Sequence, residues 1–276
     1  HLAKAGVHRL DELIGQAHRL EPDPARAALI EARHLDLGGL QYNLPHRRGH
    51  RGDFLAEPTS RLNARLLEDA APAVQRGEAV EVGYPIRTTD RAALATLSGA
   101  LARRTHQRRM KRLAETPPAV GEGTPLPPAD DAALHLADGT IDLTFTGSAG
   151  QGFAVFLTRG MQATLHGEAN DAVAKAMSGG RVVVRPPEGA PFTAEKAAII
   201  GNCALYGATG GQLFVRGRAA DRFAVRNSGA EAVVEAVGLH ACEYMTRGTV
   251  VILGEASANV GAGMTDCFLG SGTHVE

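Results

Sequence analysis

The pattern of apolar and polar residues changes once along the chain. Up to residue 112, apolar residues recur three or four positions apart, a spacing that predicts amphipathic helices. From residue 141 onward they form short runs of Val, Ile and Leu bounded by glycine, and such runs predict β-strands. We therefore expect a helical arm followed by a β domain.

The helical part also contains one strand signal. Val80–Ile86 alternates between apolar and polar residues and is expected to be a strand. Gly77 is the expected C-cap of the third helix, and Asp90 is the expected N-cap of the fourth. Residues 42–60, rich in Pro, Gly and basic residues, are expected to form an exposed loop. The four helices are expected over Val7–Ile14, Pro24–Leu37, Leu62–Arg76 and Arg91–Arg112.

A proline-rich segment separates the two parts. Residues 113–140 contain five prolines and three glycines, a composition typical of a linker. The expected organisation is a helical arm at 1–112, a Pro-rich linker at 113–140 and a β domain at 141–276.

An internal repeat predicts the architecture of the β domain. Three segments share a hydroxyl residue, a glycine and then a strand of aliphatic residues; they are Ser178–Val184, Thr209–Val215 and Thr246–Ile252. Shorter apolar runs at Ala197–Ile200 and Ala232–Val237 divide the interval into coils of about 15–19 residues. Glycine corners between short strands predict a mainly β fold, a right-handed parallel β-helix or solenoid. A sandwich or barrel is the alternative, although hairpin signals are nearly absent.

Composition narrows the class of protein. The chain has 33 glycines, 4% aromatic residues and no tryptophan, which suits small-residue corners better than an aromatic core. A net charge of -1 and the lack of a long apolar stretch exclude a membrane-spanning protein and predict no nucleic-acid or membrane partner. Because the chain begins with His1, we expect a piece of a longer polypeptide or a processed product.

The cysteines predict a reducing compartment. Cys203, Cys242 and Cys267 are widely spaced and include no Cys-x-x-Cys pair. An odd number of isolated cysteines is typical of buried thiols in a cytoplasmic protein, and it does not suit an iron–sulfur cluster.

Three segments invite a chemical interpretation. Gly147–Gly152 has alanine where the dinucleotide-binding fingerprint requires its second glycine, so we interpret the segment as a corner. His240–Glu243 contains His, Cys and Glu, but no second ligand cluster accompanies it, and we interpret it as a buried turn. The basic run Arg103–Arg112 lacks the interleaved aromatics of a nucleic-acid site and is interpreted as a solvated helix end or a subunit contact.

Longer runs carry a resemblance to one enzyme family. They include Gly147–Gln151, Gly167–Asp171, Ile200–Asn202, Ala204–Thr209, Val225–Ala230 and Cys242–Thr246. These runs resemble the C-terminal domain of the glutamate synthase large subunit. Leu10–Gly15 and Tyr84–Ala92 resemble the segment that follows the family's flavin-binding barrel, so the resemblance covers residues 1–105 and 141–265.

The resemblance implies a fold, a role and partners. The family's large subunit joins a glutamine amidotransferase, a central domain, an FMN-binding barrel with an iron–sulfur cluster, and a glycine-repeat β-helix. Ammonia from glutamine adds to 2-oxoglutarate, and FMN reduces the imine to glutamate with electrons from NADPH or ferredoxin. The expected role of this region is to hold the amidotransferase and FMN-barrel domains together, in the same chain or as separate subunits.

No catalytic, cofactor-binding or metal-binding residue of the family maps onto this chain. The family's nucleophile is an N-terminal cysteine, whereas this chain begins with His1. FMN and the iron–sulfur cluster are therefore expected on partner domains. Domain contacts are expected at polar corner residues, for each of which an internal hydrogen bond is the alternative: Ser148, Gln151, Asn202, Tyr206, Asn227, Glu243 and Tyr244.

Two other functions stay open. The chain would alternatively be the β-helix subunit of a related enzyme, methylglutamate synthase or formylmethanofuran dehydrogenase, or a non-enzymatic interaction scaffold. The Leu10–Gly15 and Tyr84–Ala92 matches argue against formylmethanofuran dehydrogenase, which has no reason to carry a post-barrel arm. An independent nucleotide-binding enzyme is a weaker alternative.

Overall fold

The structure, a computed structural model, describes residues 2–13, 15–26, 31, 60–115, 132–265 and 268–271. The chain forms two compact units, residues 1–58 and 59–276. Expectations that fall on the loop at 42–59, on most of the Pro-rich segment and on Cys267 lie outside the described residues.

The described part of the first unit contains four short 3-10 turns and, at Glu31, one α-helical residue. The turns are η1 (Ala3–Ala5), η2 (Leu10–Leu13), η3 (Ala17–Arg19) and η4 (Pro24–Arg26). The α-helix predicted over Val7–Ile14 is wrong in the described residues, because only the 3-10 turn η2 forms there. Left-handed glycines, Gly6 and Gly15, lie on either side of it. A helix this short is marginal in water unless tertiary packing supports it.

Two helices open the described part of the second unit, α2 (Arg61–Asp69) and α3 (Ala71–Arg76). The hydroxyl of Ser60 accepts a hydrogen bond from the Asn63 amide and caps α2. The predicted single helix over Leu62–Arg76 is interrupted at Ala70, two residues before Pro72, which has no amide hydrogen to donate. The predicted C-cap Gly77 is confirmed, with φ of 77°.

Helix α4 (Ala95–Glu115) begins four residues later than predicted. Ala92 and Leu94 have left-handed φ angles of 48° and 79°, so the backbone cannot be α-helical before Ala95. The Asp90 carboxylate accepts a hydrogen bond from the Arg87 amide and closes a turn, so the N-cap predicted at Asp90 is wrong.

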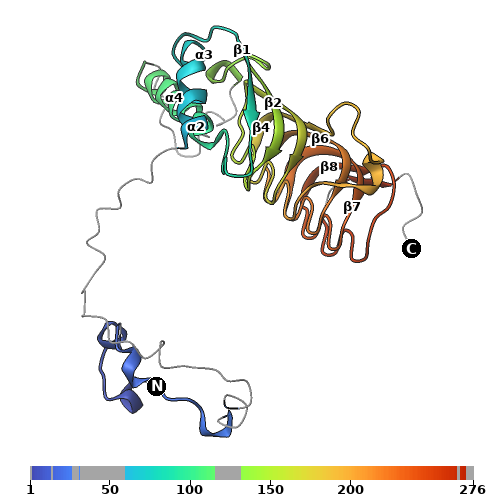
Figure 1. Ribbon diagram of the computed structural model, residues 1–276. Helices are drawn as coiled ribbons and strands as arrows, with labels where there is room; N and C mark the ends of the chain where they lie inside the picture. Colours follow the sequence, from blue (N-terminus) through green and yellow to red (C-terminus); the bar gives the residue numbers. More distant parts are fainter. Residues whose placement is uncertain are drawn as a thin grey trace. The chain divides into compact units, whose positions relative to one another are not determined.

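A single parallel sheet dominates the second unit, and the mainly β prediction is confirmed. The strands pair in the order β1-β2-β3-β4-β6-β7-β8-β9, and the short β5 pairs with β3 and β6. Figure 1 shows them stacked from the end where α2, α3 and α4 gather. The strands are β1 (Val80–Ile86), β2 (Ile141–Ala149), β3 (Met161–Ala169), β4 (Ser178–Arg185), β5 (Ala198–Ile200), β6 (Gly210–Ala219), β7 (Ser228–Val237), β8 (Arg247–Ile252) and β9 (Phe268–Ser271).

All the predicted strand segments lie on strands of this sheet. From β2 onward most paired residues are 18 to 20 positions apart, as in Ala163 with Val182 and Ala232 with Val250, so the expected coil of 15–19 residues was slightly short. Before β2 the spacing is longer, because Val80 on β1 pairs with Ile141, 61 positions later. One step, from Val182 to Leu213, takes 31 residues because an excursion at 186–197 and β5 lie between. The parallel pairing excludes an antiparallel sandwich or barrel for the described strands.

Aliphatic residues at one register position form the centre of the core. Strands β2, β3, β4, β6, β7 and β8 each contribute one side chain, and every member is at most 2% exposed: Leu143, Ala163, Val182, Leu213, Ala232 and Val250. Fully burying a Val or Leu side chain contributes about 1.5–3 kcal/mol. The alternation of buried and exposed residues along each strand therefore fixes its register.

Glycines stack where β2 and β3 end. Gly147 pairs with Gly167, and both have positive φ, 129° and 157°. A Cβ on Gly167 would overlap the carbonyl oxygen of Gly147, which is backbone and cannot rotate away. Only glycine allows the two strands to approach this closely.

The buried side chain of Asn63 closes the first layer of the stack. Its Nδ2 donates to the Ala92 carbonyl at 3.1 Å, and its Oδ1 accepts from the Leu94 amide at 2.9 Å. Asn63 thereby takes the place of the backbone that a preceding layer would supply. On the neighbouring β1, the Tyr84 hydroxyl donates to Asp69, and burial together with this carboxylate raises the pKa of Tyr84.

Candidate functional site

The residues expected at domain contacts lie mostly in a series of corner turns. Six turns of the same length alternate with the strands: 151–156, 171–176, 202–207, 221–226, 239–244 and 258–263. In each turn, every second residue has a positive φ, for example Ala172, Ala174 and Ala176 at 63°, 52° and 54°. A left-handed conformation costs a non-glycine residue about 1–2 kcal/mol.

Hydrogen bonds between adjacent corner turns offset this cost. The Ala172 amide donates to the Asn202 carbonyl, Ala174 donates back to Phe153, and Ala176 donates forward to Tyr206, all at 2.8–2.9 Å. The turns at 202–207, 221–226 and 239–244 repeat this forward, back, forward pattern. The turns from 151–156 to 239–244 are therefore each bonded to the layer before and to the layer after.

Acidic and amide side chains add a second ladder at the start of the turns. Asp171 Oδ1 accepts from the Asn202 amide at 2.7 Å, and Asn202 Oδ1 accepts from the Asp221 amide at 3.0 Å. Asp221 Oδ1 continues the series by accepting from the Leu239 amide at 2.8 Å. The expected contact residue Asn202 thus has an internal hydrogen bond while its side chain remains exposed.

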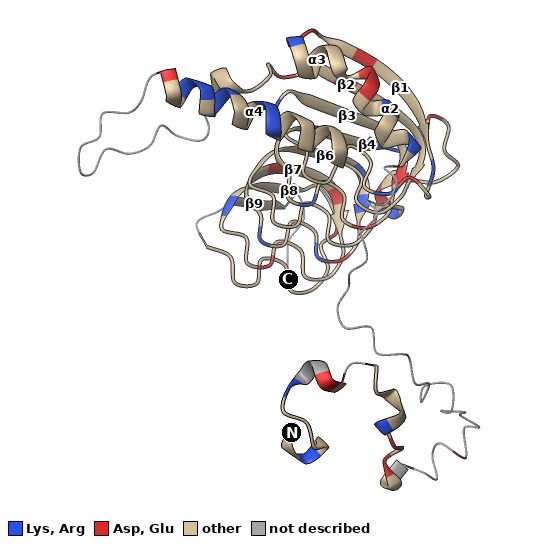
Figure 2. Cartoon of the chain, turned by 90° about the vertical axis from the view of Figure 1, so that its left-hand side faces the viewer, with Lys and Arg blue, Asp and Glu red and all other residues tan. Residues whose placement is uncertain are grey.

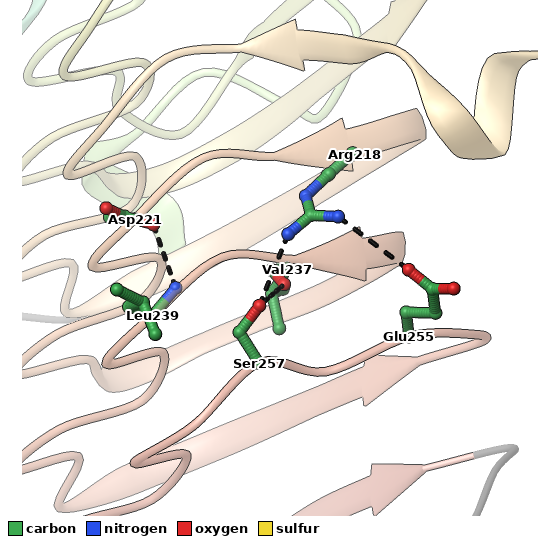
Figure 3. Close-up of polar contacts among 6 residues, drawn as sticks. All are labelled: Arg218, Asp221, Val237, Leu239, Glu255 and Ser257. Atoms are coloured by element: carbon green, nitrogen blue, oxygen red, sulfur yellow. Dashed lines mark hydrogen bonds and ion pairs between the residues drawn. The ribbon is translucent and has the colours of Figure 1, made fainter.

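Arginine 218 joins layers that are not adjacent. From β6, its guanidinium donates to the Ser257 hydroxyl at 3.2 Å and lies 3.8 Å from the Glu255 carboxylate, as Figure 3 shows. Ser257 in turn donates to the Val237 carbonyl at 3.3 Å. This polar network ties β6 and β7 to the segment beyond β8.

Five of the seven predicted contact residues lie within the corner turns. Gln151 and Asn202 take the first turn position, Tyr206 and Glu243 the fifth, and Tyr244 the sixth. Tyr244 is 58% exposed and Gln151 is exposed, so both present their side chains on the outer surface of the turns.

Asn227 and Ser148 have different surroundings. Asn227, directly after the fourth turn, is fully buried, and its amide bonds the backbone of Gly229 and Ala230. Ser148 lies on β2, where its hydroxyl donates to Glu168 at 3.0 Å beside a cavity of about 210 Å³. The structure therefore brings five of the residues into one kind of turn and leaves these two outside it. A contact role for all seven stays a prediction.

Sequence reasoning missed several exposed corner residues. Phe156 is 59% exposed at the same turn position as Tyr244, and the Lys175 ammonium lies 5.4 Å from the centre of the Tyr206 ring. Arg222 and Arg226 are also exposed. Aligning the six turns residue by residue would have revealed these positions. We call the exposed side chains of Gln151, Phe156, Lys175, Arg222, Arg226 and Tyr244, together with the half-buried Tyr206, the corner face.

The two segments that invited a catalytic interpretation are both corner elements. Gly147–Gly152 runs from the end of β2 into the first corner turn, with no helix after it. His240 and Cys242 lie in a turn, where His240 Nδ1 is 2.7 Å from Glu243 Oε1 and Cys242 is buried. No group of three His, Cys, Asp or Glu side chains within the described ranges could hold a metal ion.

The basic run lies on the outer half of α4. The helix is buried near Leu97 and Leu101, and most residues beyond it are exposed. Figure 2 shows the Lys and Arg residues grouped there. Partial burial and the neighbouring Arg108 lower the pKa of Arg104. Among the described helices, none is long and apolar enough to cross a membrane.

Comparisons of the sequence with known proteins find one group of relatives. A family model described as the GXGXG motif matches residues 131–269. The chain is 41% identical over 273 residues to the chloroplastic ferredoxin-dependent glutamate synthase of Spinacia oleracea, covering 96% of this chain and 15% of that protein. It is 36% identical over 271 residues to the glutamate synthase [NADPH] large chain of Bacillus subtilis (strain 168), covering 96% and 16%. Against glutamate synthase [NADH] of Schizosaccharomyces pombe the identity is 38%, with 96% and 11% covered.

Proposed function

The chain belongs to the GXGXG family and corresponds to the glycine-repeat region of the glutamate synthase large subunit. We propose that it is a rigid domain that couples the other domains of that enzyme. The chain spans about 15% of the length of the spinach relative, which leaves room for further domains in the same polypeptide. In the proposal these are a glutamine amidotransferase and an FMN-binding barrel with an iron–sulfur cluster.

The double ladder of backbone hydrogen bonds carries the proposal. Strands pair on one side of each layer, and corner turns bond forward and back on another. A layer held at two places resists both bending and sliding, so domains docked on the stack would keep a fixed separation. Such stiffness suits a spacer across which ammonia passes from one active site to another without loss.

We also propose a right-handed parallel β-helix as the finer description of the fold. The step of 18 to 20 residues that recurs between most neighbouring strands and the repeated order of strand and corner turn support this description. In this architecture the corner turns form one continuous ridge, along which the corner face would meet a neighbouring domain.

The proposal is tested in the full-length large subunit with its partner proteins and cofactors. The variant Tyr206→Ala/Tyr244→Ala removes two aromatic side chains from the corner face without touching its backbone bonds. We expect it to hydrolyse more glutamine than it forms glutamate, because looser docking would release ammonia to solvent. The measurement is the ratio of glutamine consumed to glutamate produced.

A strand-face variant provides the control. Thr144 is exposed on β2, away from the corner turns, so Thr144→Ala should leave the ratio at the wild-type value. An unchanged ratio in the double tyrosine variant would contradict a coupling role for the corner face. An equal rise in both variants would instead indicate general loss of stability.

A further inference from the structure

The outer half of α4 carries basic residues along the continuation of its buried face. Leu97 and Leu101 are buried against the core. Because side chains three or four positions apart share one side of a helix, Arg104, Arg108 and Lys111 continue the side that Leu97 and Leu101 begin. Arg104 is partly buried, and the other two are exposed. In Figure 2 this half of the helix extends beyond the strands. We call Arg104, Arg108 and Lys111 the basic stripe.

The charges of the basic stripe are poorly balanced within the chain. Helix α4 contains six Lys and Arg residues and one acidic residue, Glu115 at its last position. Lys111 Nζ lies 3.8 Å from Glu115 Oε1, whereas Arg104 and Arg108 have no carboxylate within 4.0 Å among the described residues. A solvated helix is usually stabilised by opposite charges four positions apart, and like charges at this spacing repel each other. An acidic partner would relieve this repulsion.

The kind of cation and the length of the helix favour a partner rich in carboxylates. Arginine supplies five of the six cations of α4. A guanidinium group binds a carboxylate through two parallel hydrogen bonds, which an ammonium group cannot do. The outer half, from Leu101 to Glu115, is about 21 Å long at 1.5 Å per residue. Its three stripe residues are about one turn apart, so they match carboxylates repeated along one side of a partner helix.

The surroundings of the basic stripe favour an acidic protein over a nucleic acid. At the inner end of the stripe, Arg104 Nη2 lies 3.7 Å from the position that a Cβ on Gly77 would take, and the exposed Glu78 follows directly. Glu68 on α2 and Glu81 on β1 are also exposed. A nucleic acid is charged along its whole length and would be repelled by these carboxylates where it ran past the stripe. Helix α4 also has no aromatic residue on which a base could stack.

From this arrangement we propose that the basic stripe is the docking site for an acidic helix of a partner protein. The partner helix would lie along the outer half of α4, with its carboxylates on Arg104, Arg108 and Lys111. The charge of such a helix is confined to one side and to a few turns, so it meets the stripe without meeting the acidic residues beyond it. The proposal is independent of the coupling role, because the corner face belongs to other segments.

Two labelled peptides of identical composition test the geometry. Both are alanine-rich helices that contain glutamate; one carries its glutamates along one side, and its isomer spreads them around the helix. Binding to the 276-residue chain is followed by fluorescence anisotropy, with a DNA duplex of similar length as the third probe. The one-sided peptide should bind about fivefold more tightly than its isomer, the gain from aligning two or three exposed ion pairs. Its affinity should fall as salt is added.

Paired variants test the side of α4 that binds. Arg108→Gln should weaken binding of the one-sided peptide about threefold, the contribution of one exposed ion pair. The control Arg103→Gln removes the same charge from an exposed position about 140° around the helix, and it should change the affinity by less than about 1.5-fold. Because Arg108 has no carboxylate within 4.0 Å among the described residues, Arg108→Gln should keep the wild-type urea midpoint.

Three results would overturn the proposal. Equal affinities for the two peptides would show that only net charge attracts them. Equal effects of Arg108→Gln and Arg103→Gln would show that the basic stripe is not the binding side. Tighter binding of the DNA duplex than of the one-sided peptide would assign the helix to nucleic acid instead.

Discussion

Strands and corner turns both bond each layer to its neighbours, but they do so with two different backbone conformations. In the strands, β-branched and aliphatic residues alternate with polar ones, and the extended backbone pairs in register. In the corner turns, every second residue is left-handed and its amide reaches a neighbouring layer. Because the corner bonds are made by the backbone, side chains as different as Ala176, Arg226 and Tyr244 occupy the same turn position. The side chains of the corner turns can therefore vary without loss of the hydrogen bonds between layers.

The largest expected difference comes from adding a methyl group to a glycine near the end of a strand and to a glycine in a corner turn. Gly167→Ala, at the end of β3, should destabilise the protein by about 4 kcal/mol or more, because the new Cβ overlaps the Gly147 carbonyl. Gly207→Ala lies at the sixth position of a corner turn, with nothing within 4 Å of the new Cβ. It should cost about 1 kcal/mol, the strain of a left-handed alanine.

Urea unfolding followed by circular dichroism measures both variants. If Gly167→Ala does not fold, its lack of a native spectrum counts as the large effect, and Gly207→Ala supplies the measurable partner. Similar losses for the two variants would contradict the distinction between strand ends and corners.

The end of the stack offers a second test, because there a side chain replaces the corner backbone. Asn63→Leu leaves the Leu94 amide without its partner, whereas the Ala92 carbonyl still accepts from the Ala95 amide at 3.1 Å. We expect a loss of about 2 kcal/mol in the free energy of unfolding, since an unsatisfied buried group costs about 1–3 kcal/mol. Arg61→Leu, on the exposed face of the same helix, should change stability by less than about 0.5 kcal/mol. A small effect at Asn63 would mean that water caps the first corner equally well.

Asn227 tests a single corner in which a polar residue replaces an apolar one. The equivalent positions of other layers hold Met177, Ala208 and Met245, all buried. Asn227→Ala should cost about 2 kcal/mol because the Ala230 amide and carbonyl lose their side-chain partner.

Asn227→Met separates packing from hydrogen bonding at this position. It restores the apolar volume of the other layers but not the hydrogen bonds, so it should remain almost as destabilised as Asn227→Ala. Wild-type stability of the methionine variant in thermal unfolding would show that packing alone determines this corner.

The same contrast explains what the sequence could predict. Strands β4, β6 and β8 were predictable because aliphatic runs follow a glycine, a local signal that lies within seven residues. The left-handed corner positions were not predictable from glycine, because alanine, arginine, cysteine and histidine occupy most of them. Their conformation is imposed by bonds to neighbouring layers, which no single stretch of sequence contains.

The candidate residues follow the same logic. Tyr206 and Tyr244 were selected as polar corner residues, and the structure does place them in corner turns. Phe156 and Lys175 were missed because an apolar and a charged residue share no pattern until the turns are aligned in space. The excursion at 186–197 was visible only as an unequal spacing of the repeat.

The smallest expected effect is a change in stability whose sign should differ between a corner turn and a strand. Ala176 is left-handed at 54° in a corner turn, and Ala198 is exposed on β5, outside the left-handed region. Ala176→Gly should stabilise the protein by about 0.5 kcal/mol, because relief of left-handed strain exceeds the extra entropy of glycine in the unfolded chain. Ala198→Gly should destabilise it by about 0.5–1 kcal/mol, because there glycine only adds that entropy. Urea midpoints measured side by side give both values. Two losses of equal size would mean that the corner backbone carries no strain, and the freedom of its side chains would then need another cause.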